Sequence, residues 1–139
     1  MKRLNKLLLL VSFCLLLGSS NQALALEDEF ICAAAQAIGC ALDAPCIKGS
    51  ADSVNLPLLW RVNLKDGHIT SLRHRGEERS SQIIEMIEEE NTLSLFGVDP
   101  GSAWSVYIDR EDGKMTMTSS TYDAGYIIHG DCSSAFIEQ

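Results

Sequence analysis

The chain has 139 residues, of which 46% are hydrophobic and 22% charged, and its formal net charge at pH 7 is −8. This length accommodates one domain with one modest hydrophobic core. The acidic balance excludes general binding to nucleic acid and to anionic membrane surfaces, because like charges repel, and it favours a cationic partner.

The first 25 residues have the three parts of a secretory signal peptide. A basic start at 2–6 precedes an apolar run at 7–17, and the sequence Ala-Leu-Ala at 23–25 fits a small-x-small cleavage site. The apolar run is shorter than a membrane-spanning helix. Cleavage would remove three positive charges, which changes the formal charge from −8 to −11. We therefore expect a signal peptide at 1–25 and a single secreted or periplasmic domain at 26–139, without a membrane span.

Four of the five cysteines follow the predicted signal peptide, at Cys32, Cys40, Cys46 and Cys132. An even number in a small exported chain predicts disulfides, and the spacing does not match a zinc site. Cys32 and Cys40 are too far apart to bond each other, since eight residues span about 26 Å in a strand and about 12 Å in a helix. Two pairings remain: Cys32–Cys132 with Cys40–Cys46, or Cys32–Cys46 with Cys40–Cys132. We favour the first, because it joins the start of the first strand to the end of the last one, as antiparallel neighbours require.

The segment 30–41 is the most ambiguous in secondary structure. Its alanines favour a helix, whereas a strand would place Phe30, Cys32 and Cys40 on one face. We predict a strand, because a strand allows both disulfides to form.

The rest of the chain has the pattern of short strands joined by turns. Trp104, Val106 and Ile108 alternate with polar residues, so they mark the buried face of a strand. The sequences at 65–67 and 99–101 both end in glycine and predict hairpin turns. The expected strands lie at 30–41, 58–64, 68–73, 82–88, 92–98, 103–109, 114–119 and 125–132.

Strands of this length and spacing predict an all-β fold, a small antiparallel meander or an eight-stranded barrel with two disulfides. Closure as a barrel removes exposed sheet edges. The large side chains expected to point inward either fill the interior or line a cavity for one small apolar ligand. These candidate ligand-binding residues are Trp60, Trp104, Met115, Met117 and Tyr126.

No motif of a known catalytic or nucleotide-binding class occurs in the sequence. The histidines at 68, 74 and 129 lack the spacing of a metal site. We therefore expect no enzymatic activity, no catalytic residues, no cofactor and no metal. The glutamates of 85–90 form either a solvated loop or a docking patch for a basic protein. The basic residues between 73 and 79 either meet an anionic ligand or balance the glutamates beside them.

Several short patterns together resemble a family of small exported bacterial proteins with no assigned activity. They are F-x-C at 30–32, N-L-P at 55–57, W-S-V-x-I-D-x-x-x-G-K-M at 104–115 and G-Y-I-I-x-G-x-C at 125–132. The resemblance covers nearly all of the predicted mature chain and implies no functional residues.

In outline the chain is also similar to periplasmic lysozyme inhibitors of the C-type, which are small, disulfide-tied and β-rich. Gly101 and Trp104 stand where that family has a glycine and a tryptophan before a late strand, but the S-G-x-x-Y loop motif of the family is absent. We expect a non-enzymatic secreted or periplasmic protein that binds another protein, such as a cationic envelope protein, or the cell envelope itself. The alternatives are a small β-barrel that binds an apolar small molecule, and a periplasmic lysozyme inhibitor.

Overall fold

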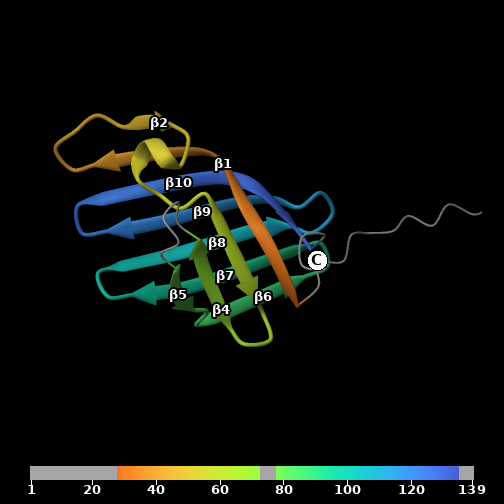
Figure 1. The fold of residues 1–139 in the computed structure, drawn as a ribbon. Helices are drawn as coiled ribbons and strands as arrows, with labels where there is room; N and C mark the ends of the chain where they lie inside the picture. Colours follow the sequence, from red (N-terminus) through yellow and green to blue (C-terminus); the bar gives the residue numbers. More distant parts are fainter. Residues whose placement is uncertain (1–27, 73–77, 135–139) are drawn as a thin grey trace, which may run out of the picture.

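The computed structural model describes residues 28–72 and 78–134, so the predicted signal peptide lies outside the described part of the chain. Within it, the regular structure is β apart from one short 3₁₀ helix, η1 (Asp52–Val54) (Figure 1). The strands are β1 (Glu29–Ala41), β2 (Ile47–Gly49), β3 (Leu59–Asn63), β4 (His68–Leu72), β5 (Glu78–Gln82), β6 (Glu85–Glu89), β7 (Thr92–Asp99), β8 (Ser102–Asp109), β9 (Lys114–Thr121) and β10 (Ala124–Ser133).

Nine strands form one antiparallel sheet in the order β5-β4-β3-β1-β10-β9-β8-β7-β6, with β2 paired to β1 beside this path. The edge strands β5 and β6 are consecutive in the chain and are separated only by Ile83 and Ile84. If the sheet were flat, eight spacings of about 4.8 Å would put its edges about 38 Å apart. Three peptide units span at most about 11 Å, so the sheet must curl. Figure 1 shows β3, β4 and β5 folded across the other strands, which makes a half-barrel.

The predicted all-β fold with two disulfides is confirmed. The strand expected at 30–41 is β1, and seven other predicted segments correspond to β3, β4 and β6 to β10. Two strands were missed. β2 lies between the strands predicted at 30–41 and 58–64, and β5 lies between those predicted at 68–73 and 82–88, apart from its last residue, Gln82. β5 contains no apolar residue, so its sequence carries no alternation from which a strand could be predicted.

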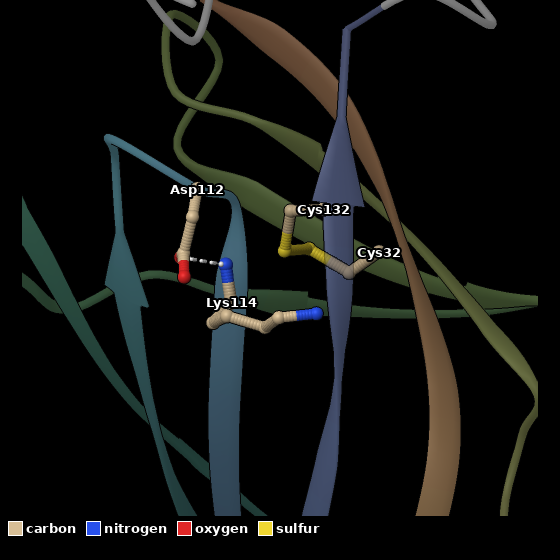
Figure 2. The surroundings of a disulfide bond; sticks show 4 residues. All are labelled: Cys32, Asp112, Lys114 and Cys132. Carbon is tan, nitrogen blue, oxygen red and sulfur yellow. Dashed lines mark hydrogen bonds between the residues drawn. A yellow bond between two sulfur atoms is a disulfide. The ribbon is translucent and has the colours of Figure 1, made fainter.

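The preferred disulfide pairing is also confirmed. Cys32 and Cys132 lie directly opposite each other on the neighbouring strands β1 and β10 and are bonded (Figure 2). Cys40 and Cys46 are bonded across the loop that joins β1 to β2. The first bond therefore ties the first strand of the half-barrel to the last.

The hairpin turn between β8 and β9 packs against the end of β10. The Cys132 N–H donates to the Gly113 carbonyl oxygen at 2.7 Å. Gly113 has a φ of 74°, and a Cβ there would lie 2.5 Å from the Cys132 carbonyl oxygen, so the position requires glycine. The Asp112 carboxylate accepts a hydrogen bond from the Lys114 backbone N–H at 2.9 Å, which fixes the turn next to the disulfide (Figure 2).

The end of the half-barrel beside this disulfide is filled by side chains, and we call it the packed end. Phe30, Val62, Leu93, Leu95 and Ile108 are each 0% exposed and come from four strands, β1, β3, β7 and β8. The predicted inward alternation on β8 is therefore confirmed at this end. These residues are apolar and fully buried, so their burial supplies much of the hydrophobic stabilisation of the fold.

Candidate functional site

Beyond these packed residues along β7, β8 and β9, the half-barrel holds a cavity of about 450 Å³, and we call this region the open end. Its apolar lining comes from β3, β4, β8, β9 and β10 and consists of Trp60, Ile69, Trp104, Met117 and Ile128. Leu56 and Pro57, in the connector before β3, complete the apolar wall. Cavities of this volume with a mostly apolar lining are typical of small-molecule sites.

Serine at the inward positions explains why this end is not filled. Ser71, Ser81, Ser102 and Ser119 line the cavity from four different strands. A serine side chain is too short to reach the axis of the half-barrel, where leucine or isoleucine would meet a partner from the opposite wall. The hydroxyl groups also provide hydrogen-bonding sites along a wall that is otherwise apolar.

A chain of hydrogen bonds joins three strands at the point where the two edges of the sheet meet. The Trp104 indole Nε1–H donates to Ser81 Oγ at 2.7 Å, and the Ser81 hydroxyl donates to Asp99 Oδ1 at 2.7 Å. These residues belong to β8, β5 and β7, and all three line the cavity. The serine uses its single proton toward Asp99 and accepts from Trp104. The arrangement holds the indole in one orientation and satisfies the indole N–H, which would be costly to leave unpaired.

Trp104 owes its position to the glycine opposite it on β7. Gly97 pairs with Trp104 in the β7–β8 register. A Cβ at Gly97 would lie 2.0 Å from Trp104 Cζ2 and 2.7 Å from the Gln82 carbonyl oxygen. The absence of a side chain at Gly97 is therefore what lets the indole lie against the wall of the cavity.

Two charged side chains stand at the mouth of the cavity. Asp99 accepts the hydrogen bond from Ser81, whereas Arg79 on β5 is exposed. The three ion pairs found among the described residues do not include Arg79. Of the basic residues predicted to cluster between 73 and 79, Arg79 alone is described, because positions 73–77 lie outside the described residues.

Three of the five predicted ligand-binding residues line this cavity: Trp60, Trp104 and Met117. Met115 is 4% exposed and does not line it. Tyr126 lines a separate hollow of about 170 Å³ beside the Cys40–Cys46 loop. The structure therefore brings together three of the predicted residues and separates the other two from them.

Sequence reasoning did not predict that three polar residues, Arg79, Ser81 and Asp99, share a site with Trp104. The first two lie on β5, the strand without apolar residues, and Asp99 was assigned to a turn. The only signal for them in the sequence was the isolated basic cluster, which raised the possibility of an anionic ligand. Their meeting with Trp104 depends on the curl of the sheet, which no local pattern reports.

The described histidines lie away from the cavity. His68 Nδ1 is 2.7 Å from the Asp66 carbonyl oxygen, and His129 Nδ1 is 3.1 Å from the Thr116 hydroxyl. His74 lies outside the described residues. Across 28–72 and 78–134, no group of three or more His, Cys, Asp or Glu side chains is placed to hold a metal ion.

The described residues include no helix long and apolar enough to cross a membrane. The two disulfides indicate an oxidising compartment. Comparison of the chain with protein-family models, with curated proteins and with solved structures finds no match.

Proposed function

We propose that this chain is an exported binding protein that holds a small, largely apolar molecule in the open end of its half-barrel. The observation that carries the proposal is the cavity of about 450 Å³ with both tryptophans in its wall. This volume falls within the range of small-molecule sites, about 300–1,000 Å³. The predicted signal peptide and the disulfides support a periplasmic or extracellular location.

The lining suggests how such a ligand would be held. The faces of Trp60 and Trp104 offer flat apolar surfaces, and Met117 adapts its shape to irregular groups. Burial of about 200 Å² of apolar ligand surface is worth about 5 kcal/mol, from which the cost of ordering the ligand is subtracted. Serine hydroxyls would orient a polar group near the mouth.

Binding rather than catalysis is supported by the chemistry of the lining. Ser81 already donates its proton to Asp99 and accepts from an indole, so its oxygen is engaged on both sides. The lining residues include no histidine that could act as a general base toward a serine. The lining is therefore suited to holding an apolar molecule rather than to reacting with it.

The test uses the uncharged fluorescent probe N-phenyl-1-naphthylamine. The sequence contains two tryptophans and both line the cavity, so energy transfer from tryptophan to the probe reports binding, and a cavity variant compared with a surface variant locates it. We expect the wild-type protein to bind the probe saturably. The variant Ser119→Phe places a ring in the cavity and should weaken binding at least tenfold.

Ser120→Phe is the matched control. Ser120 is the next residue on β9, is exposed and points away from the cavity lined by Ser119. The Ser120→Phe variant should bind the probe with an affinity within twofold of that of the wild type. Absence of saturable binding by the wild type, or equal weakening in both variants, would contradict the proposal.

Binding of a cationic envelope protein, or of a lysozyme, stays a prediction based on charge and resemblance. A protein partner would not need the cavity, because the edge of the sheet at β6 lies apart from it.

A further inference from the structure

Among residues 28–72 and 78–134, the strand β6 is a free edge of the sheet. It pairs with β7 on one side and ends the strand order on the other. All five of its residues, Glu85–Glu89, are exposed, although alternate side chains point to opposite faces. An unpaired edge presents backbone N–H and C=O groups that can pair with a strand from another chain.

The geometry of the chain explains why this edge is free. The Ile83 N–H donates to the Gly67 carbonyl oxygen at 2.8 Å, and the Ile84 N–H donates to the Phe96 carbonyl oxygen at 2.8 Å. Gly67 belongs to the turn between β3 and β4, and Phe96 belongs to β7. Residues 83 and 84 thus bridge the two edges of the curled sheet, and β6 continues beyond this bridge with β7 as its only neighbour in the sheet described (Figure 1).

Three exposed apolar side chains lie on the outer face beside this edge. Ile87 is 44% exposed, Phe96 38% and Tyr107 51%. Ile87 pairs with Ser94, which is two residues before Phe96 on β7. Phe96 pairs with Ser105, which is two residues before Tyr107 on β8. Each is therefore a diagonal neighbour of the next, within reach of long side chains. On β6 itself, Glu85 and Glu89 flank Ile87 on the same face, because side chains repeat every second residue.

We propose that β6 is the docking edge for an extended cationic segment of another protein, which adds to the sheet as one more strand. The complementary pattern is basic-x-apolar-x-basic, with the basic residues opposite Glu85 and Glu89 and the apolar residue opposite Ile87. The pattern on β6 is symmetric about Ile87, so it fits a strand of either direction. Backbone pairing would supply affinity and the alternate side chains would supply specificity.

A second copy of this chain does not fit the same edge. Two β6 strands paired antiparallel about Ile87 would place Glu85 of each opposite Glu89 of the other. Like charges directly opposite each other destabilise a strand pair. The glutamates therefore protect the edge from self-association and favour a basic partner.

The test uses the purified, oxidised protein labelled with ¹⁵N and a blocked peptide with the core Lys-Thr-Ile-Thr-Lys. We expect saturable shifts of the amide signals of 85–89 and slower hydrogen exchange there. A peptide with the same sequence but N-methylated at all five core backbone nitrogens keeps its charge and loses the N–H donors of both edges. It should bind at least tenfold more weakly.

The protein variant Glu85→Lys with Glu89→Lys should also weaken binding at least tenfold. The double variant Asp43→Lys with Asp52→Lys is the matched control, because it makes the same change in net charge at exposed sites beside β1, β2 and η1, away from β6. It should bind within twofold of the wild type. Ser119→Phe should bind the peptide unchanged, since docking at β6 does not depend on the cavity.

If the protein bound the N-methylated and the unmethylated peptide with equal affinity, the proposal would be overturned, because net charge alone would then explain the binding. The proposal also fails if the control variant loses as much affinity for the peptide as the β6 variant. It fails too if the amide shifts at 85–89 depend on protein concentration without peptide, because two protein copies would then be pairing through β6. The peptide comparison needs no protein variant, so the proposal stays testable even if a β6 variant fails to fold.

Discussion

The packed end and the open end of the half-barrel are built by the same strands and differ in their inward residues. On β8, Ile108 and Val106 lie toward the packed end and are buried, whereas Trp104 and Ser102 line the cavity. The same order, from apolar to polar, occurs on β7 and β9. The comparison teaches that the packed core and the candidate binding site occupy different lengths of the same strands, so that the open end can keep a cavity while the packed end holds the fold.

Removal of each disulfide is the strongest test of this division. The Cys32–Cys132 bond, at the packed end, joins residues 100 apart in the sequence, and Cys40–Cys46 joins residues 6 apart. In the chain-entropy account their losses cost about 4.7 and about 2.2 kcal/mol. We expect the double alanine variants to differ in this order in urea unfolding under oxidising conditions. Equal losses would show that the long loop does not stabilise the packed end.

The next test compares the loss of stability when a buried isoleucine is shortened to alanine at each end. Ile108 is 0% exposed at the packed end, and Ile128 is 1% exposed but lines the cavity. Ile108→Ala should cost about 3 kcal/mol, because it leaves an empty space among packed side chains. Ile128→Ala should cost about 2 kcal/mol, at the low end for this substitution, since the space it leaves joins an existing cavity. Chemical denaturation measures both, and a larger loss for Ile128→Ala would break the distinction between the ends.

A substitution at Gly97, the residue opposite Trp104, tests the open end alone. Gly97→Ala introduces a Cβ that meets the indole and should destabilise the protein by about 1–3 kcal/mol. It should also change the tryptophan emission, because the indole must leave the wall. Gly125→Ala is the matched strand variant, since a Cβ there meets nothing within 4 Å. An unchanged emission spectrum in Gly97→Ala would show that the cavity wall repacks around Trp104.

The smallest effect is expected at an exposed ion pair on the surface of the packed end. Lys114 Nζ donates to the Asp131 carboxylate, and this hydrogen bond raises the pKa of Lys114 above its ordinary value of 10.5. A raised lysine pKa contributes stability below the ordinary value, and the contribution is lost as the pH rises through the folded pKa. Asp131→Asn should therefore differ little from the wild type at neutral pH, because both groups are exposed to solvent. The thermal midpoints of the two proteins should converge above pH 10.5. A difference that grows at high pH would contradict this account.

Much of the fold could be predicted from the sequence. Alternation placed Trp104, Val106 and Ile108 on the buried face, and turn residues at 65–67 and 99–101 separated the strands correctly. The reach of a disulfide excluded Cys32–Cys40, and the expected neighbourhood of the first and last strands favoured Cys32–Cys132, which the structure confirms. The strands and turns are local features, so the sequence was sufficient to predict most of them, and it reduced the disulfides to two possible pairings.

The candidate site was decided by the tertiary structure. Met115 and Met117 have the same place in the alternation of β9, yet only Met117 lines the cavity. Alternation reports the side of the sheet and says nothing about the position along the barrel axis. Ser81 and Asp99 meet Trp104 only because the curl brings the two sheet edges together. That curl, and with it both the cavity and the free edge of β6, comes from packing between distant strands.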